Sequence, residues 1–192
     1  MKHCILFIDG ENFLHKIRQV LKESGVDKNK IDLAHIDLNK LFDAPLKGFR
    51  VTRKLFYASK LHNNPETTKK SQELIKFQRA LRNNLVYQGS EFIIAGNVRA
   101  SKIGNKVVFR EKGVDVKIAV DMVSLSHKKL LDCAILASSD SDLQPAISEL
   151  HELKIQTVYL GFEANPNKGL SYTTDRTILL RNSEVLSSCP NK

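Results

Sequence analysis

Cysteine is scarce in this sequence, and no hydrophobic run is long enough to cross a membrane. The three cysteines, Cys4, Cys133 and Cys189, are odd in number and far apart, so neither a disulfide framework nor zinc-ligand spacing is visible. The six histidines include no His-x-x-x-His pair. The apolar run near the amino terminus breaks at Asp9, which makes it too short for a signal peptide. We therefore expect a cytoplasmic protein without a membrane partner.

Acidic residues are the minority charge, with 21 Asp and Glu against 30 Lys and Arg and a formal net charge of +9. This excess favours polyanionic partners, and nucleic acid above all. With 42% apolar and 27% charged residues, the composition is that of a globular protein. A length of 192 residues suits one domain, and the sequence shows no repeat, low-complexity segment or linker. We predict a single domain at residues 1–186 and a flexible tail at residues 187–192.

Strand and helix patterns alternate along the chain. Such alternation predicts an α/β fold with a mainly parallel sheet and helices on its faces. The predicted strands are residues 3–8, 49–58, 91–98, 133–137, 155–160 and 177–180, with residues 106–110 as a hairpin partner across Gly104-Asn105. The predicted helices are residues 11–24, 36–42, 66–84, 114–131 and 143–153.

Two of the predicted strands end in acids. The first strand runs into Asp9, and the strand at residues 133–137 is followed by Asp140 and Asp142. In open α/β sheets, ligands bind beyond the carboxyl ends of the strands. We assume the strand order 3-2-1-4-5, because it makes the first and fourth strands neighbours and brings these acids together.

A third component comes from the helix predicted at residues 114–131. On a helical projection Asp115 falls inside a broad apolar arc, where a carboxylate is costly unless something pairs with it. Asp121 falls on the polar side beside Lys117 and Lys128, which is typical of a solvated or salt-bridged surface acid. We therefore include Asp115 in the site and leave Asp121 out.

Converging carboxylates repel one another, and a divalent cation removes that difficulty. Oxygen ligands without Cys or His favour Mg²⁺ or Mn²⁺ over zinc. A single Asp at a strand end is more often a helix cap or a structural residue. The repetition on two strands, together with Asp115, favours a metal site.

Polar and basic side chains offer contacts to a substrate. Asn12, Ser138 and Ser139 adjoin the acids, and they suit either a phosphate contact or a helix cap. Basic residues share one face of the helix at residues 66–84 and continue on the preceding strand, as a stripe that tracks phosphates or as a solvated surface. The stripe consists of Lys69, Lys76 and Arg79 with Arg53 and Lys54, and Arg50 and Lys60 flank it.

These motifs resemble the NYN family, PIN-like nucleases, in its LabA-like branch. The matching segments are residues 7–12 (FIDGEN), residues 112–116 (KGVDV) with Asp121, residues 136–143 (LASSDSDL) and residues 170–178, which include Asp175. The resemblance implies a PIN-like three-layer fold with sheet order 3-2-1-4-5, an acidic pocket for Mg²⁺ or Mn²⁺, and cleavage of RNA. It assigns the metal-site acids to Asp9, Asp115, Asp140 and Asp142.

Two departures from the family pattern stand out. Ser138-Ser139 replaces the usual Ser-Gly, which makes a bulkier turn, and Leu143 stands where an aromatic residue is often found. The family also often has an acid at the position of Asp121, so the role of this residue stays open.

The leading hypothesis is a metal-dependent ribonuclease acting on single-stranded RNA. A second hypothesis is a non-catalytic RNA-binding or assembly module, since a fold does not by itself determine a function. A third is a phosphatase of the haloacid dehalogenase type, which needs an Asp where this chain has Glu11. The sequence leaves the oligomeric state open, a homo-oligomer included.

Overall fold

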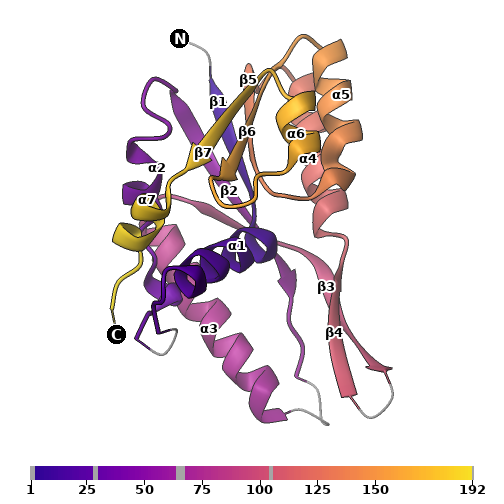
Figure 1. The fold of residues 1–192 in the computed structure, drawn as a ribbon. Coiled ribbons are helices and arrows are strands. Elements are labelled where there is room, and N and C mark those ends of the chain that lie inside the picture. Colours follow the sequence, from indigo (N-terminus) through magenta and orange to yellow (C-terminus); the bar gives the residue numbers. More distant parts are fainter. Residues whose placement is uncertain (1–2, 28–29, 64–67, 104–105, 192) are drawn as a thin grey trace.

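The computed structural model describes residues 3–27, 30–63, 68–103 and 106–191, which form a seven-stranded sheet with helices on both faces (Figure 1). The strand order is β4-β3-β2-β1-β5-β6-β7, and only β4 pairs antiparallel. The five main strands of the prediction correspond to β1, β2, β3, β5 and β6, so the predicted order 3-2-1-4-5 is confirmed. Strand β7 adds a sixth parallel strand beside β6. The strands are β1 (Cys4–Asp9), β2 (Val51–Lys60), β3 (Glu91–Ile103), β4 (Lys106–Lys112), β5 (Cys133–Ala137), β6 (Gln156–Phe162) and β7 (Arg176–Leu180).

The central strands β1 and β5 are buried along their whole length. Both are almost continuously apolar, as expected for parallel strands that are covered on both faces. They pair in register from Cys4 opposite Cys133 to Ile8 opposite Ala137. Their carboxyl ends therefore lie side by side at one edge of the sheet.

The helices form two layers, one on each face of the sheet (Figure 1). Apolar residues of α1 (Gly10–Glu23), α2 (Leu38–Asp43), α3 (Thr68–Tyr87) and α7 (Asn182–Ser188) build the core on one face. The core on the other face comes from α4 (Val114–His127), α5 (Gln144–Glu152) and α6 (Lys168–Thr173). The three-layer arrangement is the predicted one. None of the helices in the described part of the chain is both long and apolar enough to span a membrane.

Some helix boundaries differ from the prediction. Helix α4 ends at His127 and not at residue 131, since Lys129 has a left-handed backbone with φ of 56°. Helix α3 runs on to Tyr87, past the predicted end at residue 84. Two short 3₁₀ turns, Leu33–His35 and Ser141–Leu143, precede α2 and α5. The predicted start of α3 at residue 66 and the turn at Gly104-Asn105 lie outside the described residues.

The carboxyl-terminal tail also differs from the sequence prediction of a flexible segment. Ser188 and Cys189 are buried. The carbonyl oxygen of Ser188 accepts a hydrogen bond from the Asp37 amide at 2.9 Å, and that of Pro190 accepts one from the Asp32 amide at 3.1 Å. The tail therefore binds the segment that leads into α2. The polar residues of the tail do not by themselves indicate this contact.

Gly10 connects the buried strand β1 to α1 where the helix crosses β2. A Cβ atom at this position would overlap the Phe56 ring and the carbonyl oxygen of Tyr57. We expect Gly10→Ala to lower the free energy of unfolding by about 1–3 kcal/mol, because a packed interior does not yield to the added methyl group. Urea denaturation measures this change. His15→Ala, at an exposed position of the same helix, is the control and should stay within about 0.5 kcal/mol of wild type.

Candidate active site

Three of the predicted acids converge at the carboxyl edge of the sheet. Carboxylate oxygens of Asp115, Asp140 and Asp142 lie within 4.8 Å of one another, and we call these three residues the acidic group. Asp140 follows β5 and caps the 3₁₀ turn Ser141–Leu143, with Oδ1 accepting a hydrogen bond from the Asp142 amide at 2.9 Å. Asp140 and Asp142 come from the loop after β5, whereas Asp115 comes from α4. These side chains meet because of the strand order, which no short stretch of sequence shows.

Asp115 enters the group from the first turn of α4. Gly113 precedes the helix with φ of 95°, a left-handed conformation that glycine adopts without strain. The amino-terminal end of a helix favours a carboxylate, because the first amides and the helix dipole carry partial positive charge. Asp115 is half-buried, in agreement with its place in the apolar arc of the sequence.

Asp9 differs from the other predicted acids, because it is buried and is not one of the three residues of the acidic group. Its side chain is 6% exposed. Oδ1 accepts a hydrogen bond from the Asn12 amide at 3.3 Å, and Oδ2 accepts one from Ser138 Oγ at 3.1 Å. Burial raises the pKa of Asp9, and the nearby charges of Asp140 and Glu11 raise it further. Ser138 Oγ also accepts a hydrogen bond from the Asp140 amide at 3.1 Å, so it links Asp9 to the acidic group.

Two asparagines hold the loop that carries the acidic group. Asn12 Oδ1 accepts a hydrogen bond from the Ser139 amide at 2.9 Å. Asn167 Nδ2 donates to the Ser139 carbonyl at 2.9 Å and to Ser141 Oγ at 3.0 Å. Asn12, Ser138 and Ser139, predicted as substrate contacts, thus make hydrogen bonds within the protein. Ser139 is not among the residues with positive φ, so this turn does not require the glycine that is usual in the family.

Asn167 is a residue that the sequence analysis missed. It lies between the strands predicted at residues 155–160 and 177–180. There it caps α6, with Oδ1 accepting a hydrogen bond from the Leu170 amide at 2.9 Å. The Tyr159 hydroxyl accepts a hydrogen bond from the Asn167 amide at 3.0 Å and further fixes this residue. An Asn before a short helical pattern is a recognisable cap signal. Its contacts with Ser139 and Ser141 have no local signature.

Asp121 lies on α4 outside the acidic group. Its Oδ2 accepts a hydrogen bond from the Tyr57 hydroxyl at 3.0 Å, and Oδ1 forms an ion pair with Lys117 Nζ at 2.5 Å. Burial raises the pKa of Tyr57, and the charge of Asp121 raises it further, so the hydroxyl stays a donor. The ion pair with Lys117 agrees with the prediction of a salt-bridged acid, but Asp121 is half-buried and also binds the buried Tyr57.

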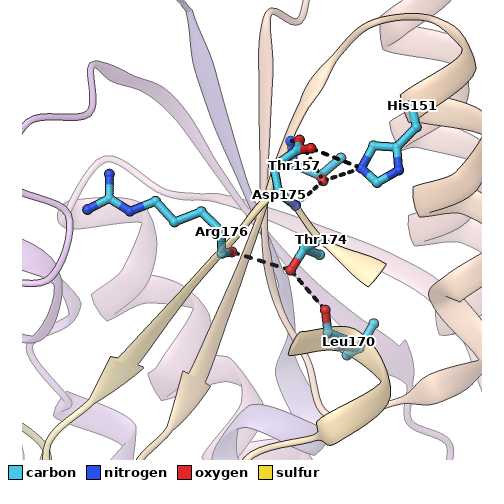
Figure 2. Close-up of polar contacts among 6 residues, drawn as sticks. All are labelled: His151, Thr157, Leu170, Thr174, Asp175 and Arg176. Atoms are coloured by element: carbon cyan, nitrogen blue, oxygen red, sulfur yellow. Dashed lines mark hydrogen bonds and ion pairs between the residues drawn. The ribbon is translucent and has the colours of Figure 1, made fainter. Parts of the chain in front are cut away.

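Asp175, from the late segment that resembles the family, lies where β6 and β7 begin, at the amino-terminal ends of these strands. Figure 2 shows its contacts with Thr157 and His151. Its Oδ2 accepts hydrogen bonds from the Thr157 amide at 2.7 Å and from Thr157 Oγ1 at 3.1 Å. His151 Nε2 lies 3.6 Å from Asp175 Oδ1 and 2.8 Å from Thr157 Oγ1. Because Thr157 begins the buried part of β6, Asp175 ties the start of β7 to this strand and takes no part in the acidic group.

The predicted basic stripe divides into two sets. Arg53 forms a two-point ion pair with Glu91, at 2.6 and 2.8 Å, and Lys54 Nζ donates to Asn39 Oδ1 and the Gln88 carbonyl. Both side chains therefore stabilise the fold. Both residues lie in the first half of β2, away from its carboxyl end. The second set is exposed on α3, on the face opposite its buried leucines, and consists of Lys69, Lys76 and Arg79.

Other lysines lie at the carboxyl edge itself. Lys60 ends β2 and pairs with Asn97 of β3, which in turn pairs with Lys112 of β4. All three residues are exposed, and Lys112 comes just before the Gly113 turn that leads to Asp115. The carboxyl edge therefore carries two exposed lysines as well as the acidic group.

Asp9 offers a direct test of this arrangement through stability. Keeping a buried carboxylate ionised above its raised pKa costs free energy, and the cost disappears as the pH falls through that pKa. Asp9→Asn removes the charge and keeps an oxygen for the Asn12 amide. We expect the variant to be more stable than wild type at neutral pH in EDTA, with a difference that shrinks in acid, as measured by urea denaturation.

Asp9→Ala is the matched control for this measurement. It removes the charge together with the helix cap, whose loss costs about 1 kcal/mol. It should therefore be less stable than Asp9→Asn at every pH. If Asp9→Asn is less stable than wild type by an amount independent of pH, burial of charge is not the dominant cost at this residue.

Comparison with known proteins agrees with the geometry. None of the curated proteins matches the chain. Its fold is similar to the crystal structure of a protein of unknown function from Vibrio parahaemolyticus, with a TM-score of 0.57 and 16% identity over 93% of each chain. The family model of the NYN domain matches residues 3–181, without distinguishing a branch of the family. Since this match spans nearly the whole chain, the protein belongs to the NYN domain family of PIN-like nucleases.

Proposed function

We propose that this protein is a metal-dependent ribonuclease that hydrolyses phosphodiester bonds of single-stranded RNA at the acidic group. The observation that carries the proposal is the convergence of Asp115, Asp140 and Asp142 within 4.8 Å, at the carboxyl edge where α/β sheets bind ligands. Membership of the nuclease family supports it. The same membership leaves a phosphatase of the haloacid dehalogenase type without support.

The donor set of the acidic group suits a hard divalent cation. All three side chains offer carboxylate oxygens, which favour Mg²⁺ or Mn²⁺ over zinc. Within the described ranges no Lys or Arg forms an ion pair with any of them, so their mutual repulsion has no internal counter-charge. A bound cation would lower the pKa of a water molecule and neutralise charge on the phosphoryl group.

The residues around the acidic group act as positioning residues in this proposal. Ser138 joins Asp9 to the Asp140 amide, and Asn12 and Asn167 fix the Ser139 backbone from two sides. The loop is thereby held before any ion or substrate arrives, which reduces the cost of ordering it. The buried charge of Asp9 adds to the negative field that attracts a cation.

The RNA backbone would lie along the carboxyl edge near Lys60 and Lys112. Both lysines are exposed and flank Asn97 across three strands. Lys69, Lys76 and Arg79 can contact only RNA that runs over the outer face of α3. Phosphate contacts of this kind carry little sequence information and weaken with salt.

Neutralising the acidic group should abolish cleavage while leaving the fold intact. We expect Asp140→Asn and Asp115→Asn each to lower the rate of Mn²⁺-dependent cleavage of a labelled single-stranded RNA by at least about a hundredfold, as for other lost electrostatic contacts to a transition state. Gel electrophoresis of the products measures the rate. Asp43→Asn, at an exposed position in α2, is the matched control and should cleave like wild type.

Equal cleavage by all of these variants would contradict the proposed site. Binding of RNA without cleavage in any divalent ion would instead favour a non-catalytic RNA-binding module. Wild-type protein should also unfold at a higher temperature with Mn²⁺ than in EDTA, because a ligand that binds only the native state stabilises it. That shift should vanish in Asp140→Asn and persist in Asp43→Asn.

The path of the RNA can be tested through salt dependence. We expect Lys60→Gln with Lys112→Gln to weaken RNA binding and to reduce the slope of log K against log salt by about 0.7 for each lost phosphate contact. Fluorescence anisotropy at several salt concentrations measures both quantities. Lys47→Gln, an exposed lysine before β2, is the control. A larger effect of Lys76→Gln with Arg79→Gln would place the backbone on the outer face of α3.

A further inference from the structure

A pocket of about 420 Å³ is lined by residues of α1 and α3 and by residues of β2 and β3. Pockets of about 300–1,000 Å³ hold small-molecule ligands in proteins, so this one can admit a single planar ring system with part of a sugar. We call it the α1–α3 pocket. Its walls include Phe56, Phe77, Phe92, Leu74, Arg18 and Glu11.

Aromatic and planar groups form one wall of the α1–α3 pocket. The rings of Phe56 and Phe92 stack at 5.3 Å between centroids. Phe77 is partly buried, and the Arg18 guanidinium lies 5.8 Å from the centre of its ring. A flat ring with a guanidinium over its face is the kind of surface on which nucleobases stack. Leu74, which is 40% exposed, leaves the mouth of the pocket apolar and open.

Polar groups on the same walls match the edge of a base. Glu11 is exposed in the first turn of α1. Burial lowers the pKa of Arg18, and the charge of Glu11 offsets part of this lowering. Gln78 Nε2 donates to the Ser59 carbonyl at 2.9 Å, which fixes the orientation of its amide. A carboxylate accepts hydrogen bonds but repels phosphate, so Glu11 suits the N–H groups of a base and not the backbone.

The α1–α3 pocket begins next to Asp9, which Ser138 links to the Asp140 amide of the acidic group. Gly10 and Glu11, which line the pocket, directly follow Asp9 in the chain. On its far side the pocket reaches Val98, next to Asn97 between the two edge lysines. A strand with a phosphate at the acidic group can therefore place a neighbouring base between α1 and α3.

We propose that the α1–α3 pocket binds one nucleobase of the RNA strand, stacked on Phe77. This inference rests on the proposed function for the identity of the strand as RNA. The base lies against the Phe77 ring where Arg18 now lies, and the guanidinium turns to a phosphate of the same strand. Glu11 and Gln78 contact the edge of the base. An apolar protein side chain would fill the same space but would leave Glu11 and Arg18 without partners.

The absence of tryptophan makes this inference directly testable. Phe77→Trp places the only indole of the protein on the pocket wall. We expect single-stranded RNA, added in EDTA so that no cleavage occurs, to quench its fluorescence, and an abasic ribose-phosphate oligomer of the same length to leave it unchanged. Tyr87→Trp is the matched control, because Tyr87 is 92% exposed on the same helix outside the pocket.

The affinity for RNA provides a second measurement, which does not depend on an introduced tryptophan. Phe77→Leu keeps an apolar side chain and removes the aromatic face, so we expect it to weaken binding of RNA about tenfold. Binding of the abasic oligomer should not change. Arg82→Gln, an exposed change on α3, should alter neither.

The outcomes separate this inference from the proposed function. Equal quenching of both tryptophans, or an equal loss of RNA and abasic affinity in Phe77→Leu, overturns the base pocket even if the protein cleaves RNA. Quenching specific to Phe77→Trp in a protein that never cleaves RNA supports the pocket and overturns the nuclease. If no RNA binds at all, the pocket proposal is overturned as well.

Discussion

The parallel pairing of β1 with β5 is the constraint on which the site depends. It places Asp9 beside the turn at residues 138–140, although more than a hundred residues of chain separate them. Both strands are buried on both faces, so their register cannot slip without exposing apolar residues or burying polar ones. The strand ends are therefore fixed to one edge, and the short turn after β5 has little freedom in where it presents Asp140.

A buried acid organises this edge at a cost in stability. Asp9 is desolvated and lies near two other negative charges, which raises its pKa. Its hydrogen bonds with Ser138 and with the Asn12 amide offset part of that cost and connect the acid to the loop in front of it. Functional sites commonly carry such unfavourable charge, because the surrounding fold is stable enough to hold it. The acidic group in front is more exposed, where an ion could enter.

Helix α1 joins the two halves of the proposed RNA site. Its first residues follow Asp9 on the side of the acidic group, and Glu11 and Arg18 face the α1–α3 pocket. Gly10 lets the helix approach β2 so closely that a Cβ atom at this position would overlap the Phe56 ring and the Tyr57 carbonyl oxygen. One helix thus sets the spacing between the place for a phosphate and the place for a base.

The sequence by itself determined the residue types of the site, whereas the strand order was assumed from the two acid-ended strands and implied by the resemblance to the NYN family. Acid-ended apolar strands and Asp115 in an apolar arc are local patterns, and the structure brings Asp115, Asp140 and Asp142 together as those patterns predict. Only the tertiary structure decided that Asp9 is buried outside this group, because a strand end does not show which side chain will be desolvated. It also decided that Arg53 is engaged by Glu91 and that Asn167 supports the loop, since both contacts join segments far apart in the chain.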